Sequence, residues 1–594
     1  ILGGTVQNIY GGNILTTQTQ QNADTASENT TIVIGSKDAT TIPTINGTIY
    51  GSGKYDRIGT VEIQLVKSAT LSTIYGGSDG AGITSEVNIY LKGITANTIY
   101  GGSKNDGIVT MSNIYLETGT VTDIYGGGYG GSTVTSNIIL EGNANITNIY
   151  GGSNSNGSVG TSNIDLKSGK LTNIYGGGNS AVVGTANVIL NGITIDEIHG
   201  GSKNSGITTN TNVVLNTGTV TDVYGGGYDI GVTNAKVTQN GATVTNIYGG
   251  NQGGTGDGGE TTNTTVNIVG KTANNIYGGN KAKGITRNST INISGASTIT
   301  GKLYGGGYKS AISKSGQTGS TTINIAGGTI ENDINGGSED STVYGTTNIN
   351  IGKDAVTDNT LEAGNINIKG NIYASGSTSN DKFDTVSVYG ETHVTMDAST
   401  DSQITFSNNI FGAGKGSTYS TTDRNGADKS TVKIKDMGTS ANAHKMISIQ
   451  RTGKVSIQNS YLELMGAQDA NNYYKRASYT LNRVTNGLAL IDNSTLYTQR
   501  AFNMVGGFES LVTNESGSTT KQTVSIADGK VTRNVDNRLY SLEGVNLIFA
   551  KQEGNLEDRA NEDIWGDVNG MAFFGMYRTS RTTGAKEYDI YAPD

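Results

Sequence analysis

Residues 78–102 read SDGAGITSEVNIYLKGITANTIYGG, which is one copy of a repeat with a period of 25 residues. Its closing motif, Ile-Tyr-Gly-Gly, returns along much of the chain. The tyrosine of the motif, or the residue in its place, stands at Tyr50, Tyr75, Tyr100, Tyr125, Tyr150, Tyr175, His199, Tyr224, Tyr248, Tyr277, Tyr304, Asn335 and Tyr373. A fixed period of this size predicts a stacked-repeat protein, in which each unit contacts mainly its neighbours.

Each repeat is predicted to contain short β-strands and no helix. Gly, Thr, Asn, Ile and Val dominate it, and these residues favour strands and turns. Apolar and polar residues alternate over short runs, which is the period of a strand. A repeat of this length suits one turn of a parallel β-helix whose successive turns lie about 4.8 Å apart. The predicted fold class is therefore all-β, a parallel β-helix or β-solenoid, with rungs of about 25 residues and a C-terminal β-rich cap.

Comparison of the repeats indicates which side chains face the interior. In the segment 88–91 (Asn-Ile-Tyr-Leu) the second and fourth positions are aliphatic in every aligned copy, whereas the third becomes Asp165 in one of them. Alternation along a strand then places the aliphatic residues inside. The residue before the motif Ile is polar and is expected to face solvent. Ile149→Asp should therefore be strongly destabilising, and Asn148→Asp nearly silent.

The first position of that segment is a column of asparagines, for which we predict an amide ladder at a bend of each turn. Its members are Asn88, Asn113, Asn137, Asn163, Asn187 and Asn212. Composition agrees with stacked strands, because the chain has only 2 prolines, which cannot donate to a β-ladder. The 89 glycines predict tight corners with positive φ.

Composition also excludes several classes of function. Cysteine is absent, so the chain has no disulfide and no thiolate metal site. The net charge of −9, with no basic patch, argues against nucleic-acid binding. No apolar run is long enough to form a membrane-spanning helix. We assign no metal, no cofactor and no catalytic residue from the sequence.

The repeat changes character along the chain, which predicts three domains. Residues 1–375 form a regular β-solenoid with Ile-Tyr-Gly-Gly repeats, and residues 376–515 form irregular β-solenoid rungs. Residues 516–594 form a C-terminal β-rich capping or assembly module. This last part holds Trp565 and the aromatic run at 571–577, which suits a cover for the open end of the last rung.

The N-terminal residues 1–4 (Ile-Leu-Gly-Gly) read as a degenerate copy of the motif, so we expect the chain to begin within the array. An uncovered rung presents unpaired N–H and C=O groups. We therefore predict self-association or contact with neighbouring subunits there. The alternatives are further repeats before residue 1, or a cover formed by residues 15–28.

The Ile-Tyr-Gly-Gly repeats with Thr- and Asn-rich strands resemble the large repeat adhesins and autotransporter-like passenger domains of bacterial surfaces. Residues 571–576, after 565–568, also resemble C-terminal segments of such passengers. The resemblance implies a β-helix with a structural or adhesive role. Repeats rich in Thr, Asn and Gly, with few charges and no Cys, suit an extracellular location or a bacterial cell surface.

Two groups of residues are candidates for a functional site. The first is the tyrosine column, which should face outward because the adjacent Ile faces inward. It forms either an aromatic ribbon for glycan rings or a partner protein, or a stack that only stiffens the fold. Its members are Tyr75, Tyr100, Tyr125, Tyr150, Tyr175, Tyr224 and Tyr248.

The second group is acidic, with Asp196, Glu197 and His199 on one turn and Asp222 on the next. Two stacked carboxylates about 5 Å apart suit a cation or polysaccharide chemistry. The alternative is an exposed column that merely tolerates polar residues. We thus expect an extracellular structural or adhesive β-solenoid of a bacterial surface protein or filament, without catalysis. The second possibility is a polysaccharide-acting β-helix enzyme or a phage tailspike-like glycan-binding protein. Under either interpretation, a glycan or a host surface is a candidate partner beside neighbouring subunits.

Overall fold

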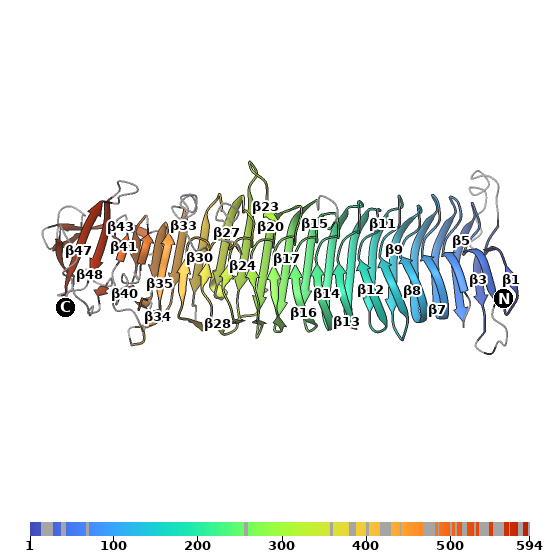
Figure 1. Ribbon diagram of the computed structural model, residues 1–594, viewed down its shortest axis with the longest axis horizontal. Coiled ribbons are helices and arrows are strands. Elements are labelled where there is room, and N and C mark those ends of the chain that lie inside the picture. The colour runs from blue at the N-terminus through green and yellow to red at the C-terminus, as the bar shows by residue number, and fades with distance from the viewer. Residues whose placement is uncertain are drawn as a thin grey trace. The chain divides into compact units, whose positions relative to one another are not determined.

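The computed structural model forms two compact units, Ile1–Thr290 with Gly307–Ala311, and Ile291–Gly306 with Ile312–Asp594. It describes residues 1–13, 28–36, 38, 43–66, 70–254, 259–356, 360–378, 388–398, 403–415, 429–439, 441–466, 481–484, 486–492, 494–498, 502–504, 508–513, 519–527, 530–533, 546–549, 563–568, 571–579 and 586–591. In both units parallel β-strands wind as a solenoid (Figure 1), which in the second unit reaches to about residue 513. This confirms the predicted fold class.

The first unit contains strands whose ends recur at the same point of each turn. They are β1 (Thr5–Val6), β2 (Ile9–Tyr10), β3 (Glu28–Ile34), β4 (Thr44–Tyr50), β5 (Arg57–Val66), β6 (Thr70–Tyr75), β7 (Ile83–Tyr100), β8 (Ile108–Tyr125), β9 (Ser132–Leu140), β10 (Asn145–Tyr150), β11 (Val159–Leu166), β12 (Lys170–Tyr175), β13 (Val183–His199), β14 (Thr208–Tyr224), β15 (Val232–Gln239), β16 (Thr243–Tyr248), β17 (Glu260–Val269), β18 (Thr272–Ala273) and β19 (Asn275–Tyr277). Strands β20 (Ile285–Ser294) and β23 (Ala311–Ile312) straddle the division between the units.

Identical positions of successive turns pair in parallel and in register. Ile149, for example, pairs with Ile124 on one side and with Ile174 on the other. The predicted interior columns are buried, and the motif isoleucines of five successive turns are fully excluded from solvent: Ile74, Ile99, Ile124, Ile149 and Ile174. The aliphatic columns at the positions of Ile89 and Leu91 are buried as well.

The motif glycines are required by close packing between turns, not by their φ angles. A Cβ atom on Gly76, Gly101 or Gly126 would lie 2.5 Å from the carbonyl oxygen of the corresponding glycine one turn further on. Glycines with positive φ lie elsewhere in the turn, as at Gly119 and Gly142. The prediction that glycine abundance reflects positive φ thus holds for only part of the glycines.

The second unit carries longer and less regular turns. Its elements are β21 (Thr298–Ile299), β22 (Leu303–Tyr304), β24 (Gly319–Ile325), β25 (Gly328–Ile330), β26 (Ile334–Asn335), β27 (Gly345–Ile351), the 3-10 helix η1 (Lys353–Ala355), β28 (Ile366–Ile368), β29 (Ile372–Tyr373), β30 (Thr392–Asp397), β31 (Ile404–Phe406), β32 (Asn409–Phe411), β33 (Ser430–Lys435), β34 (His444–Met446), β35 (Ser448–Thr452), β36 (Lys454–Gln458), β37 (Tyr461–Leu464), β38 (Leu481–Val484), β39 (Leu488–Ile491), β40 (Thr495–Thr498), β41 (Phe502–Met504) and β42 (Phe508–Thr513). The motif column continues in parallel register through β22, β26, β29, β32, β35 and β38.

The strands beyond residue 515 pair differently from the turns before them. They are β43 (Thr519–Ala527), β44 (Lys530–Arg533), β45 (Asn546–Phe549), β46 (Asp563–Val568), β47 (Met571–Thr579) and β48 (Lys586–Tyr591). Most of these pairings are antiparallel, including β46 with β47 and β47 with β48. The domain limits at residues 375 and 515 stay predictions, as does the capping role of the C-terminal strands. Of the proposed N-terminal cover, residues 15–27 lie outside the described residues. Within the part of the chain that the structure describes, no helix has the length and hydropathy of a membrane span.

Candidate functional site

The tyrosine column is a continuous stack of rings. From Tyr10 to Tyr175, consecutive ring centroids lie 4.6–5.4 Å apart and the ring planes differ by 5–12°. His199 keeps the stack intact, 5.0 Å from Tyr175 and 4.8 Å from Tyr224. The stack then continues through Tyr248 to Tyr277. We call this set of rings the aromatic ladder.

Of the two alternatives for this column, the rings form the stack, and they are not an exposed aromatic ribbon. The exposed fractions are between 0 and 8% for Tyr75, Tyr100, Tyr125, Tyr150, Tyr175, Tyr224 and Tyr248. Neighbouring rings cover both faces of a ring inside the ladder, and side chains from the loops after Gly-Gly reach the hydroxyl groups. Lys104 donates to the Tyr50 hydroxyl (3.2 Å), and Asn154 donates to that of Tyr100 (3.0 Å). A sugar ring therefore finds no free aromatic face along this column.

Burial makes these tyrosines hard to ionise. It raises the pKa of Tyr150 to about 12, with the nearby charge of Asp123 adding to the effect and a hydrogen bond from Tyr125 opposing it. The pKa values of Tyr75, Tyr125 and Tyr175 are raised further, again mainly by burial. The ladder is thus uncharged at neutral pH.

The structure brings three of the four predicted acidic-cluster residues together. Glu197 and Asp222 are register partners on adjacent turns, as predicted. The Glu197 carboxylate lies 3.3 Å from His199 Nε2, and the Asp222 carboxylate accepts from Asn246 Nδ2 (2.6 Å). Asp196 lies exposed at the neighbouring strand position.

Lys281 completes this cluster, and the sequence reasoning missed it. Its Nζ lies 2.9 Å from Asp222 Oδ2 and donates to the Tyr224 hydroxyl at 2.6 Å. The same ammonium lies over the rings of Tyr224 and Tyr248, 5.3 and 5.4 Å from their centroids. The signal was present in the sequence, because lysine stands at the same place after the motif in residues 104, 203 and 281.

The electrostatics of the cluster do not match a pair of catalytic carboxyl groups. The hydrogen bond with His199 lowers the pKa of Glu197. Burial alone would raise the pKa of Asp222, but hydrogen bonds from Asn246, Lys281 and Tyr224 outweigh it, so that pKa is lowered as well. Hydrolysis by two carboxyl groups requires one that stays protonated. Both carboxylates here are ionised at neutral pH.

His199 is a buried, neutral member of the aromatic ladder. Its exposed fraction is 1%, and burial lowers its pKa. The contact with Glu197 assigns the proton to Nε2, and Nδ1 is buried without a hydrogen-bond partner. Among the described residues, no group of three or more His, Cys, Asp or Glu side chains is placed to hold a metal ion.

The predicted amide ladder exists from Asn88 to Asn187, but it lies within strands and not at a bend. Asn113 donates from Nδ2 to Asn88 Oδ1 at 2.8 Å, and Asn137 donates in turn to Asn113 at 2.7 Å. Asn163 and Asn187 extend the series with the same geometry. Asn88 lies inside β7 and Asn113 inside β8. Each amide thus ties its own turn to the preceding one.

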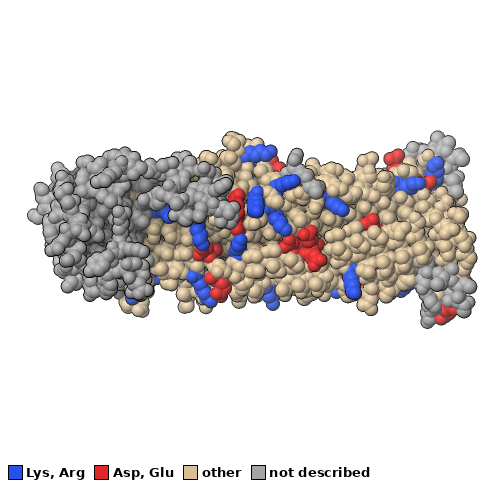
Figure 2. All heavy atoms as spheres, viewed as in Figure 1, with Lys and Arg blue, Asp and Glu red and all other residues tan. Residues whose placement is uncertain are grey.

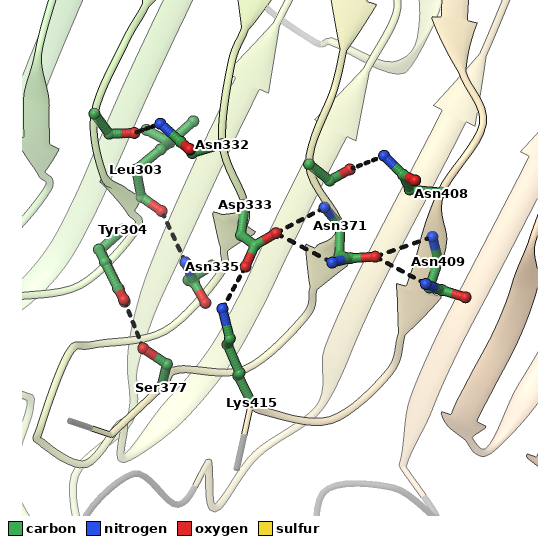
Figure 3. Close-up of polar contacts among 12 residues, drawn as sticks. Leu303, Tyr304, Asn332, Asp333, Asn335, Asn371, Ser377, Asn408, Asn409 and Lys415 are labelled. Atoms are coloured by element: carbon green, nitrogen blue, oxygen red, sulfur yellow. Dashed lines mark hydrogen bonds and ion pairs between the residues drawn. The ribbon is translucent and has the colours of Figure 1, made fainter. Parts of the chain in front are cut away.

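The polar column before the motif Ile forms further amide ladders, and these have a direction. Asn173 donates to Asn148 (2.8 Å), and Asn148 donates to Asp123 (2.7 Å). Asn275, Asn246 and Asp222 form a second series of this kind. In the second unit Asn409 donates to Asn371 (2.9 Å), which donates to Asp333 (3.2 Å), as Figure 3 shows.

Each of these series starts at an aspartate for a physical reason. The first member needs only to accept, and a carboxylate has no donor left without a partner. A charged acceptor also gives a stronger hydrogen bond than an amide. The prediction that Asn148 is a free, solvent-facing position is therefore wrong: this half-buried side chain donates to Asp123.

The lateral surface carries several exposed aliphatic side chains. Ile108 is 43% exposed, and Val134, Val182 and Ile207 are 53–54% exposed. Ile108, Val182 and Ile207 stand at, or directly before, the start of the long strands β8, β13 and β14. Charged side chains lie in small groups on the face seen in Figure 2, where uncharged residues cover most of the described surface.

No protein-family model, curated protein or solved structure matches this chain. The resemblance to bacterial repeat adhesins therefore depends on the repeat motif itself. The parallel, in-register pairing of the strands establishes the β-solenoid fold.

Proposed function

We propose that this chain is a non-catalytic structural segment of an extracellular bacterial surface protein or filament, which holds other parts of that protein at a distance from the cell. The observation that carries the proposal is the repeated linkage between turns of the first unit. Besides the backbone, each turn there is tied to its neighbours by a buried aliphatic column, the aromatic ladder and amide hydrogen bonds.

The linkages are additive along the stack, which favours resistance to fraying and proteolysis. A stacked aromatic pair contributes about 0.5–1.5 kcal/mol beyond the burial of its area. An amide hydrogen bond contributes about 0.5–1.5 kcal/mol. Opening one turn in the middle of the array breaks both on each side, together with the β-ladder. Such a stack suits a load-bearing spacer better than a mobile catalytic cleft.

The exposed aliphatic side chains are the proposed sites of contact with other molecules. Val182 and Ile207 are in adjacent turns at the same place in the repeat. Apolar side chains repeated on a polar surface suit weak, multivalent contact with a neighbouring subunit or a host surface.

Force spectroscopy of the purified chain tests the structural role. Pulling on the two ends should produce discrete unfolding events at forces well above those of a helical repeat control. Gradual extension at low force would contradict the proposal. Labelling of intact cells with an antibody against this chain tests the location, and label that appears only after permeabilisation would rule out a surface position.

The acidic cluster supports a second candidate, action on a polysaccharide. Acidic, basic and phenolic groups lie close together there, contributed by Glu197, His199, Asp222, Tyr224 and Lys281. Their burial and mutual neutralisation weigh against it. Incubation with a panel of bacterial and plant glycans decides between the two. Turnover that Glu197→Gln abolishes, in a variant with an unchanged circular dichroism spectrum, would favour the enzyme.

A further inference from the structure

An exposed column of threonines lies in the first unit, shortly before the Ile-Tyr-Gly-Gly motif of each turn. Its members pair in parallel register from one turn to the next: Thr5, Thr44, Thr70, Thr95 and Thr120. Asn145 and Lys170 follow in the same column. A second run of exposed threonines then occupies the same place in the repeat: Thr194, Thr219 and Thr243.

A second exposed column lies beside the first, two residues further along each strand. From residue 46 to residue 147 its side chains are polar and uncharged: Asn46, Ser72, Asn97, Thr122 and Thr147. The residue between the two columns is aliphatic and buried, as Val121 is between Thr120 and Thr122. Both columns therefore project from the same side of the sheet. We call the exposed residues of the two columns from Thr44 to Thr147 the threonine face.

Strand propensity does not account for the constancy of the threonines. Threonine is a good strand former, but valine, isoleucine and tyrosine are as well. The outward position in the middle of segment 88–91 is a control within the same turns. Its residues differ from turn to turn: Tyr90, Tyr115, Ile139, Asp165, Ile189 and Val214. An outward strand position of this fold thus accepts many side chains, so the threonine column points to a requirement for hydroxyl and methyl groups together.

The threonine face is a regular grid. Neighbouring turns lie about 4.8 Å apart, and residues two apart on one strand lie about 6.7 Å apart. Threonine is branched at Cβ, which restricts its χ1 angle, so its hydroxyl and methyl groups keep this spacing. Oxygen atoms in the crystal planes of hexagonal ice repeat in two perpendicular directions at distances of similar size. Water molecules bound to the face can therefore lie at lattice positions over several turns.

We propose that the threonine face binds the surface of ice crystals. The hydroxyl groups hydrogen-bond to water molecules of the lattice, and the methyl groups order the water between them. Each turn contributes a weak contact, and the contacts of a rigid array act together in one binding event. The uncharged composition of the face matters, because a charged side chain holds a hydration shell that does not fit the lattice. This activity goes beyond the structural role proposed above and does not depend on it.

Thermal hysteresis of the full chain and its partition into growing ice test the proposal. The wild-type chain should separate the freezing and melting temperatures of an ice crystal, and it should enter the ice. Thr95→Lys places a long charged side chain in the middle of the face and should remove most of both effects. Ile139→Lys adds the same charge at a half-buried outward position of another segment and should leave both effects unchanged. Circular dichroism melts show whether each variant is folded.

A gain of activity provides a second test. Lys170→Thr combined with Asp196→Thr removes the two exposed charges between the two runs of threonines, and it should widen the hysteresis gap. A gap that this folded variant leaves unchanged would overturn the proposal, as would effects that a folded Thr95→Lys chain retains. A wild-type chain without hysteresis or ice partition would also overturn it. Binding to cellulose or chitin particles without ice partition would contradict it too and would assign the face to a crystalline polysaccharide.

Discussion

Replacing Asn148 by aspartate tests the direction of the amide ladders. The wild-type side chain donates to Asp123 Oδ1 at 2.7 Å and accepts from Asn173 at 2.8 Å. The substitution removes the donor and places a second carboxylate one turn from Asp123. A lost hydrogen bond to a charged group costs about 1.5–3 kcal/mol. Repulsion at about 4.8 Å adds roughly 1–3 kcal/mol for effective dielectric constants between 80 and 20. Together these contributions predict a loss of about 3–6 kcal/mol at neutral pH.

The loss should shrink in acid. The paired carboxylates raise each other's folded-state pKa above the unfolded value of about 3.9. The destabilisation is therefore present above that value and fades as the pH falls, because a protonated carboxyl can donate again. Thermal melts followed by circular dichroism between pH 3 and pH 7 measure both effects.

Two variants control for the added charge. Thr147→Asp introduces the same charge at an exposed position next to the ladder, and it should have little effect. The double variant Asp123→Asn/Asn148→Asp has the composition of the wild-type chain and moves the carboxylate by one turn, so it should recover most of the lost stability. If Asn148→Asp and Thr147→Asp melt at the same temperature at pH 7, the ladder does not stabilise the fold as argued.

Three other perturbations follow from the same contacts. Ile149→Asp places an unpaired charge at a fully buried position and should lower stability by several kcal/mol; wild-type resistance to proteolysis would refute the interior assignment. Raising the pH above the unfolded tyrosine pKa of about 10 should weaken the fold. Burial raises the folded-state pKa, to about 12 at Tyr150, so the stability gained from the protonated rings is lost as the pH rises through this range. An unchanged melting temperature between pH 9 and pH 11.5 would contradict this expectation. Lys281→Met should lower stability by ~1–3 kcal/mol, because Asp222 loses its half-buried ionic partner. Lys92→Met, at an exposed ion pair, should lower it by less than ~1 kcal/mol. Equal melting temperatures of the two variants would show that the Lys281–Asp222 contact does not stabilise the fold.

The fold and its interior could be predicted from the sequence because both depend on period. A constant spacing of identical residues fixes the register, and alternation around Ile149 fixes which side is inside. The asparagine column likewise predicted bonds between turns. Its position within strands was missed because asparagine in a sequence signals a turn more often than a strand.

Alternation gives the direction of a side chain but not what covers it. The tyrosines point away from the aliphatic columns, yet loops two turns further on cover their hydroxyl groups, as Lys104 covers Tyr50. The alternation of residues in the strands does not predict the path of those loops. Lys281 was missed for the same reason, since it reaches Asp222 across 59 residues through such a loop. The adjacency of Glu197 and Asp222 needed only the period, and it was predicted.

A distance measurement between spin labels tests most directly whether the turns stack in register, on which the proposed load-bearing role depends. The chain has no cysteine, so Thr122→Cys and Thr221→Cys provide the only two labelling sites. Both positions are exposed and lie four turns apart at the same place in the repeat. We expect one narrow distance distribution that corresponds to a backbone separation of about 19 Å. A broad distribution, or one centred far from this separation after allowance for the label linkers, would contradict it.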